Sequence, residues 1–236
     1  MSLPKIKYPV TEITVPSTGK VINFRPFLVR EEKILLMAQQ SGSKKEILKA
    51  VKQIINNCSV DEIDVQKLLI VDIEYLFLQL RAISVNNIVK VSFTDGEDKK
   101  VYSFDIDLTA IAIKKPKKKV SNKIQINDKV GMILKQADGE IIDNLVDIDN
   151  EGNLLMFYIR NCIKEIFDEE SVYDVKESSD EELNEFIDNL PSSSLEKIKD
   201  FFASAATMEH TIAYTNNMGT ERKIVLKTLD DFFQLL

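Results

Sequence analysis

The hydrophobic period of this chain switches repeatedly between two residues and 3.6 residues, and this switching is what most constrains its fold. A period of two is typical of a half-buried strand, and a period of 3.6 is typical of an amphipathic helix. Strand-like alternation surrounds a turn sequence in residues 10–24, 88–108 and 210–226, and helical spacing fills the intervals. The pattern predicts an α+β protein in which helical blocks are separated by three β-hairpins.

The first helical block is predicted from its start signals. Pro26 keeps Arg25 extended, so that a helix begins near Val29 with two glutamates in its first turn. Ser43 and Glu46 form a capping box that opens a second helix, and Asp72 is expected to cap the later part of a third helical region over residues 65–83. The second helix should bury one face, made of Ile47, Val51, Ile54, Ile55 and Cys58.

The second half is expected to be mainly helical. Ile111 and Ile113 are expected to extend the sheet of the second hairpin, and residues 124–134 alternate like strands. The further elements expected are a long helix over Leu154–Phe167, helices opened by capping boxes at Ser179 with Glu182 and at Ser193 with Glu196, and a final helix capped by Thr228.

A lysine-rich connection suggests where the chain divides. We predict an N-terminal part over residues 1–113, a connection over 114–123, and a mainly helical C-terminal part with the third hairpin over 124–236. The connection carries six lysines, and an acidic run follows over residues 168–188. Each run is either a solvated surface, which is the simpler interpretation, or a patch that steers a partner. The role of residues Lys114–Lys123 stays open.

Composition argues against several functional classes. The chain has 236 residues and a net charge of −7, which disfavours binding to nucleic acid or to anionic membranes. No segment is long and apolar enough for a membrane helix, and no signal-peptide pattern is found, so a soluble protein made in the cytosol is expected. Cys58 and Cys162 are expected to be buried free thiols rather than a disulfide.

No residue pattern indicates catalysis, a cofactor or a metal site. His210 is the sole histidine, and nothing in the sequence suggests a nucleophile and an orienting group beside it. One histidine and two distant cysteines cannot supply a structural zinc site, and phosphate-loop and dinucleotide signatures do not occur. We therefore expect no catalytic, cofactor-binding or metal-binding residues, and a protein that is not an enzyme.

Three segments occur in an order that points to a known family. They are Phe24–Ala38 (FRPFLVREEKILLMA), Asp72–Ala82 (DIEYLFLQLRA) and Leu229–Phe233 (LDDFF), with further agreement at Asn57-Cys58, at Asn161–Ile163 and at Phe201-Phe202. Together they resemble the baseplate proteins of T-even-like contractile-tailed bacteriophages, the family that includes the hub assembly protein. The resemblance covers most of the chain.

The resemblance implies a non-enzymatic structural or assembly component of the tail baseplate hub that binds other tail proteins, located in the host cytoplasm during assembly and then in the virion. The alternative is a transient chaperone for a hub protein, absent from the finished particle. A wall-degrading tail enzyme and a nucleic-acid adaptor are weaker alternatives. The expected partner-binding residues are Phe24, Arg25, Phe27, Arg30, Phe232 and Phe233.

Two questions about these residues stay open at this stage. Arg25 and Arg30 either bind a partner or pair locally, and the local role is favoured. Core packing is the favoured explanation for each aromatic residue taken singly, and the alternative is that together they leave an apolar patch that marks an interaction site. One departure is that many relatives carry cysteine pairs like those of zinc ribbons in the second and third hairpin turns. Here the turns at residues 94–97 and 215–221 have none, so they must be held by turn chemistry and packing.

Overall fold

The computed structural model describes residues 6–116, 120–145 and 151–233, and in it the chain forms two compact units. One unit comprises Met1–Lys114 with Thr207–Leu236, and the other comprises Lys115–Ala206. The structure thus groups Thr207–Leu236 with the N-terminal residues, whereas the sequence placed them in the C-terminal part. The division into three parts that the sequence suggests stays a prediction. Of the lysine-rich connection, residues 117–119 lie outside the described residues.

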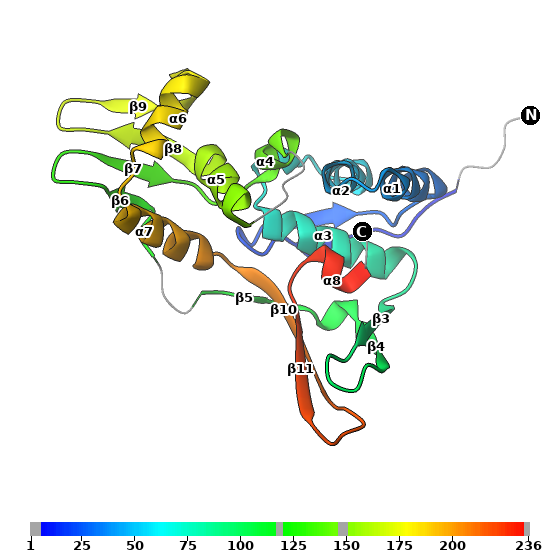
Figure 1. The fold of residues 1–236 in the computed structure, drawn as a ribbon. Helices are drawn as coiled ribbons and strands as arrows, with labels where there is room; N and C mark the ends of the chain where they lie inside the picture. The colour runs from blue at the N-terminus through cyan, green and yellow to red at the C-terminus, as the bar shows by residue number, and fades with distance from the viewer. Residues whose placement is uncertain (1–5, 117–119, 146–150, 234–236) are drawn as a thin grey trace, which may run out of the picture. The chain divides into compact units, whose positions relative to one another are not determined.

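The predicted α+β class is confirmed, and the three predicted hairpins form as antiparallel pairs (Figure 1). The first pairs β1 (Thr11–Thr14) with β2 (Val21–Phe24), and the second pairs β3 (Ile88–Thr94) with β4 (Val101–Asp107). The third pairs β10 (Thr207–Thr215) with β11 (Glu221–Leu226). A short strand, β5 (Ala112–Lys114), joins β10 rather than the second hairpin, which corrects the expectation for Ile111 and Ile113.

The helices of the first unit build its core. They are α1 (Val29–Ser41), α2 (Lys44–Cys58), α3 (Ile70–Ser84) and the C-terminal α8 (Leu229–Phe233). The predicted apolar face of α2 is confirmed, because Ile47, Val51, Ile54, Ile55 and Cys58 are all buried. Figure 1 shows α8 beside α3, and a ring contact between Phe77 and Phe233 joins them.

Asp72 does not cap a helix. Asp72 lies inside the first turn of α3, and its buried carboxylate accepts hydrogen bonds from the backbone N–H and the hydroxyl of Ser17, at 2.9 and 2.5 Å. Ser17 lies in the turn of the first hairpin, so Asp72 fastens that turn to α3. A buried carboxylate requires such partners, and they lie 55 residues away in the sequence.

The second unit contains a four-stranded antiparallel sheet in the order β6-β7-β8-β9. Its strands are β6 (Lys123–Gln125), β7 (Gly131–Leu134), β8 (Ile163–Phe167) and β9 (Val172–Asp174). The expected helix over Leu154–Phe167 is therefore wrong in its last part, since α5 (Glu151–Cys162) ends where β8 begins. The β-branched Ile163 and Ile166 fit a helical spacing, but pairing with β7 decides their conformation.

The remaining helices of this unit are α4 (Gly139–Asn144), α6 (Asp180–Asp188) and α7 (Ser192–Ala203). The capping box of Ser179 with Glu182 is confirmed at the start of α6. The expected capping box at Ser193 is wrong, because α7 begins at Ser192, two residues earlier than a cap at Ser193 would place it, and the extended Pro191 occupies the N-cap position. The core of the unit joins α6 and α7 to the sheet through Leu183, Ile187, Ile198 and Phe201.

Candidate interaction site

The strand-to-helix segment of the first unit is organised around the carboxylate of Glu31, which is fully buried. Arg25 donates to both carboxylate oxygens, at 3.0 and 3.2 Å, and the Nε of Arg30 donates at 2.7 Å. The backbone N–H of Leu28, at the start of α1, donates at 2.9 Å. Glu31 is the third residue of the helix, the position from which a side chain reaches back to the capping residue.

Arg25 also ties this segment to the end of α2. Its guanidinium donates to the carbonyl of Asn57 at 2.7 Å and contacts the sulfur of Cys58 at 3.7 Å. The backbone of Arg25 donates to the carbonyl of Cys58 at 2.9 Å. A planar guanidinium suits this arrangement, because it offers five donors in a fixed fork.

These contacts decide the pKa of Glu31. Burial alone would raise that pKa, but hydrogen bonds from Arg25, Arg30 and Leu28 outweigh it and lower the pKa to about 2. Both arginines therefore pair locally with Glu31, and whether either one also binds a partner stays a prediction. They differ in access, however: the Arg25 side chain is 14% exposed, whereas that of Arg30 is 65% exposed. Only Arg30 offers much of its surface to a partner as well.

The four expected aromatic residues divide into two kinds. Phe24 and Phe232 are buried, so their rings belong to the core beneath this surface. Phe27 and Phe233 are half-buried against Phe77, at ring-centroid distances of 5.7 and 6.0 Å. The structure therefore brings the strand-to-helix segment and the C-terminal helix together on α3. That these residues contact a partner stays a prediction.

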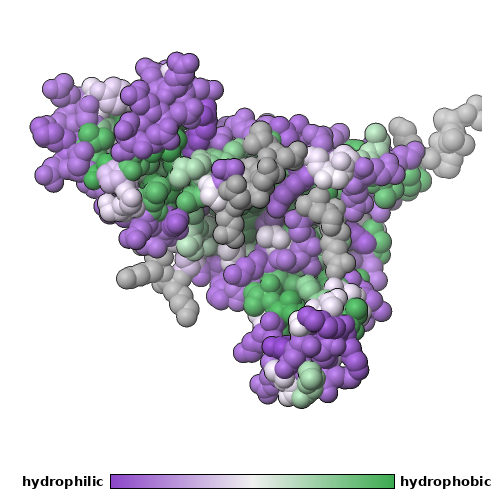
Figure 2. Space-filling model, viewed as in Figure 1, coloured by the Kyte–Doolittle hydropathy of each residue, from purple (hydrophilic) through white to green (hydrophobic). Residues whose placement is uncertain are grey.

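An exposed apolar stripe on α1 was not among the expected residues. Val29 and Met37 are 74% and 72% exposed, and Leu36 is more than half exposed. Residues spaced by seven and eight share one side of a helix, opposite the buried Glu31 and Ala38. We call this stripe, with the neighbouring Arg30 and Lys33, the α1 face. Figure 2 shows one side of the molecule, on which the surface is mostly hydrophilic and apolar side chains form separate patches. The helical spacing was visible in the sequence, but exposure was not.

The turns of the second and third hairpins are joined by a polar network centred on Asp95, which is buried. Its carboxylate accepts from the Tyr214 hydroxyl at 2.7 Å and from the backbone of Glu97 at 2.8 Å, and it forms an ion pair with Arg222 at 3.3 Å. Asn216 and Arg222 both donate to Glu97, at 2.7 and 2.9 Å. The hydrogen bond from Tyr214 is the main cause that holds the pKa of Asp95 well below its usual range.

A second set of contacts supports the same junction. The Tyr102 hydroxyl donates to Asp98 at 2.7 Å and accepts from the backbone of Asn217 at 2.7 Å. The rings of Tyr102 and Tyr214 lie 4.8 Å apart. Hydrogen bonds and ring packing therefore join these two turns. In the ranges that the structure describes, no group of three or more histidine, cysteine or acidic residues is arranged to hold a metal ion.

The histidine and the two cysteines lie where the sequence suggested. His210 lies on β10 opposite Leu226. Cys58 and Cys162 are free, buried thiols, as expected, and burial raises their pKa values to about 11 and about 12. Within the described residues, none of the helices has the length and apolar character that a bilayer crossing requires.

Comparison with known proteins supports one family. A search of curated proteins found no match. A search of solved structures also found none. The family model described as T4 bacteriophage base plate protein matches residues 6–234, which include the strand-to-helix segment, both joined hairpin turns and α8. Since this match spans nearly the whole chain, the protein belongs to the T4 bacteriophage base plate protein family.

Proposed function

We propose that this protein is a non-enzymatic component of the hub of a contractile-tail baseplate and that it acts by binding other tail proteins. Membership of the baseplate family supports a structural role in the phage tail. The observation that carries the binding role is the α1 face, an exposed apolar stripe on a helix whose start is fixed by buried ionic contacts. Its working place would be the virion tail, after assembly in the host cytoplasm.

The α1 face has the chemistry of a protein interface. Methionine and arginine are enriched at interfaces, and Met37 and Arg30 lie here together with Val29 and Leu36. Glu31 holds the Arg30 guanidinium from one side, so less of its conformational freedom is lost on binding. A partner with an apolar surface bordered by carboxylates or carbonyl groups would complement this face.

Variants of the α1 face test the proposal directly. Leu36→Ser combined with Met37→Lys removes the apolar contact without touching the buried side of α1. Tagged chain carrying this change should recover tail proteins from infected cells much less efficiently than the unmodified chain. The matched control is Val101→Lys, which also places a lysine at an exposed apolar residue, here on β4. Equal recovery by the α1-face variant and the control would refute this surface as the binding site.

The second candidate is a chaperone that binds a hub protein and leaves before the particle is complete. The half-buried Phe27 and Phe233 and the exposed α1 face would serve reversible binding equally well. Mass spectrometry of purified particles separates the two roles. Stoichiometric presence of the chain would refute the departing chaperone, and its absence would refute the permanent subunit.

A further inference from the structure

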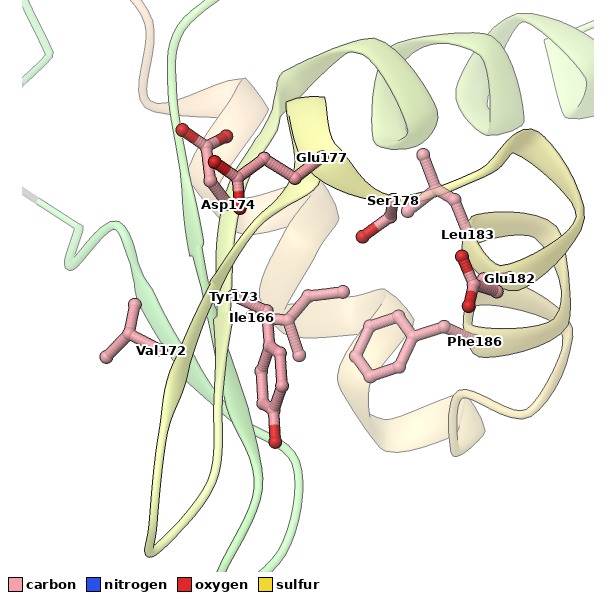
Figure 3. A pocket seen from close by; sticks show the side chains of 9 residues that line it. All are labelled: Ile166, Val172, Tyr173, Asp174, Glu177, Ser178, Glu182, Leu183 and Phe186. Carbon is pink, nitrogen blue, oxygen red and sulfur yellow. The ribbon is translucent and has the colours of Figure 1, made fainter.

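The second unit contains a groove between the sheet edge and α6. Its volume is about 440 Å³, and Ile166, Tyr173, Leu183 and Phe186 form its apolar lining (Figure 3). Figure 3 shows the Phe186 ring of α6 facing Ile166 on β8, with the Tyr173 ring beside them. The groove is therefore floored by side chains that continue the core of this unit outward to the surface.

The cross-strand register shows that this apolar row is incomplete. Ile124 pairs with Met132, Met132 with Ile166, and Ile166 with Tyr173, so the four side chains form one row across one face of the sheet. The row begins with buried residues, but its last member, Tyr173, is 47% exposed. A further strand beside β9 would place its own side chain next to Tyr173 and complete the row.

The edge of β9 is available for such a strand. β9 is the outer strand of the sheet, and the three residues Val172–Asp174 are exposed. The backbone N–H of Asp168 donates to the carbonyl of Ser171 at 3.0 Å. This bond identifies Asp168 and Ser171 as a hydrogen-bonded pair and so fixes which of the following residue pairs between β8 and β9 are hydrogen-bonded. Because hydrogen-bonded pairs alternate in an antiparallel ladder, the N–H groups of Val172 and Asp174 point away from β8. They are oriented to pair with an additional strand.

The charge of the groove restricts what can bind. Asp174, Glu177 and Glu182 line it, and none of the described residues lining it is a lysine or an arginine. Lys176, next to Glu177 in the sequence, has its ammonium 4.0 Å from Glu140. An occupant with lysines or arginines on both sides of an apolar residue would match three carboxylates around an apolar floor.

We infer that this groove binds an extended, basic segment of another protein, which pairs with the free edge of β9 and inserts an apolar side chain beside Tyr173 and Phe186. Backbone pairing supplies affinity in this mode, and the side-chain pocket supplies selectivity. The inference rests on the proposed function for the class of partner, a tail protein, but the chemistry of the groove can be tested without one.

The first test uses the full chain and a short synthetic peptide of alternating lysine and valine. We expect salt-sensitive binding, with slower amide hydrogen exchange in β9, and at least tenfold weaker binding of the matching glutamate–valine peptide. Equal binding of the two peptides, or protection elsewhere than at β9 and α6, would overturn the inference. The inference would also be overturned if light scattering showed a dimer that is lost when Val172 is substituted, because the occupant of the groove would then be a second copy of the chain.

Two variants sharpen the test. Val172→Pro removes an outward N–H without removing a β8–β9 hydrogen bond, and it should weaken peptide binding by about tenfold or more. Glu177→Lys should weaken binding by about fivefold, whereas Glu181→Lys, an equal charge change outside the groove, should leave it unchanged. Unchanged binding by both groove variants would refute the site.

A pull-down from infected cells separates this inference from the proposed function. Loss of a tail protein with Val172→Pro would support the groove. Recovery of the same tail proteins by the wild-type and Val172→Pro chains would refute the groove and leave the proposed function intact. Recovery of no tail protein by the wild-type chain would refute the proposed function, and with it the class of partner proposed for the groove.

Discussion

Replacing Glu31 by glutamine tests the view that one buried carboxylate organises the strand-to-helix segment. Glu31 accepts hydrogen bonds from Arg25, Arg30 and the start of α1, and its pKa falls from 4.5 to about 2 on folding. Since a tenfold change in proton affinity corresponds to about 1.4 kcal/mol, the ionised carboxylate contributes about 3 kcal/mol at neutral pH. That agrees with the cost of about 3–5 kcal/mol for breaking a buried ion pair.

The pH dependence of this effect has a defined sign. A carboxyl group whose pKa is lowered by folding stabilises the protein above its unfolded pKa, and this contribution is lost as the pH falls. The difference between wild type and Glu31→Gln should therefore be about 3 kcal/mol at pH 7 and about half of that or less at pH 3. Urea unfolding followed by circular dichroism at the two pH values measures it.

The matched control is Glu32→Gln, which changes the neighbouring exposed glutamate in the same helical turn. It should cost less than about 0.5 kcal/mol, because an exposed side chain away from such contacts contributes little. If Glu31→Gln costs no more than Glu32→Gln, or if its cost does not diminish with falling pH, the reasoning about the buried carboxylate is refuted.

Four further predictions concern both units. Asp95→Asn and Tyr214→Phe should each lower the Tm, and the double variant should lose less than the sum, because the two side chains share one hydrogen bond; additive losses would contradict the network. EDTA should leave the Tm unchanged, because polar contacts join the two turns, and a drop would show that a metal contributes. Glu74→Gln should stabilise the protein by up to about 3 kcal/mol at pH 8 and by little at pH 5, because burial raises the pKa of Glu74 to about 7 and its ionised form therefore costs stability. Gly131→Ala should cost about 1–3 kcal/mol in urea unfolding, since the added methyl group would overlap the Phe167 ring; a neutral result would mean that the ring moves aside freely.

Local signals in the sequence predicted much of the fold. The turn residues and period-two alternation located the three hairpins, and the apolar spacing of α2 identified its buried face. The capping box of Ser179 with Glu182 marked the start of α6 correctly. These features succeed because each depends on residues only a few positions apart.

The features that sequence reasoning missed depend on distant partners. Asp72 resembles a helix cap in sequence, but Ser17 determines its role. Asp95 and Tyr214 lie 119 residues apart, so the local sequence of neither turn indicates that they form a hydrogen bond. Residues Ile163–Phe167 fit a helix by spacing, and only pairing with β7 makes them a strand. The sequence places Glu31 in the first turn of a helix, but its contact with Arg25 depends on how the chain bends at Pro26.

The same distinction applies to the candidate site. The sequence identified the strand-to-helix segment and the C-terminal helix, and the structure brings both onto Phe77. It did not show that Phe24 on β2 is buried or that Met37 on α1 is exposed, because tertiary packing decides which apolar side chains are covered.

We propose above that this baseplate-family protein works by binding other tail proteins. Its most direct test is an affinity pull-down of tagged wild-type chain from phage-infected cells, analysed beside the proteome of the finished virion. We expect hub proteins in the pull-down and the chain in the virion. Hub proteins in the pull-down without the chain in the virion would assign it to the transient chaperone. No tail protein in the pull-down and no chain in the virion would contradict the account.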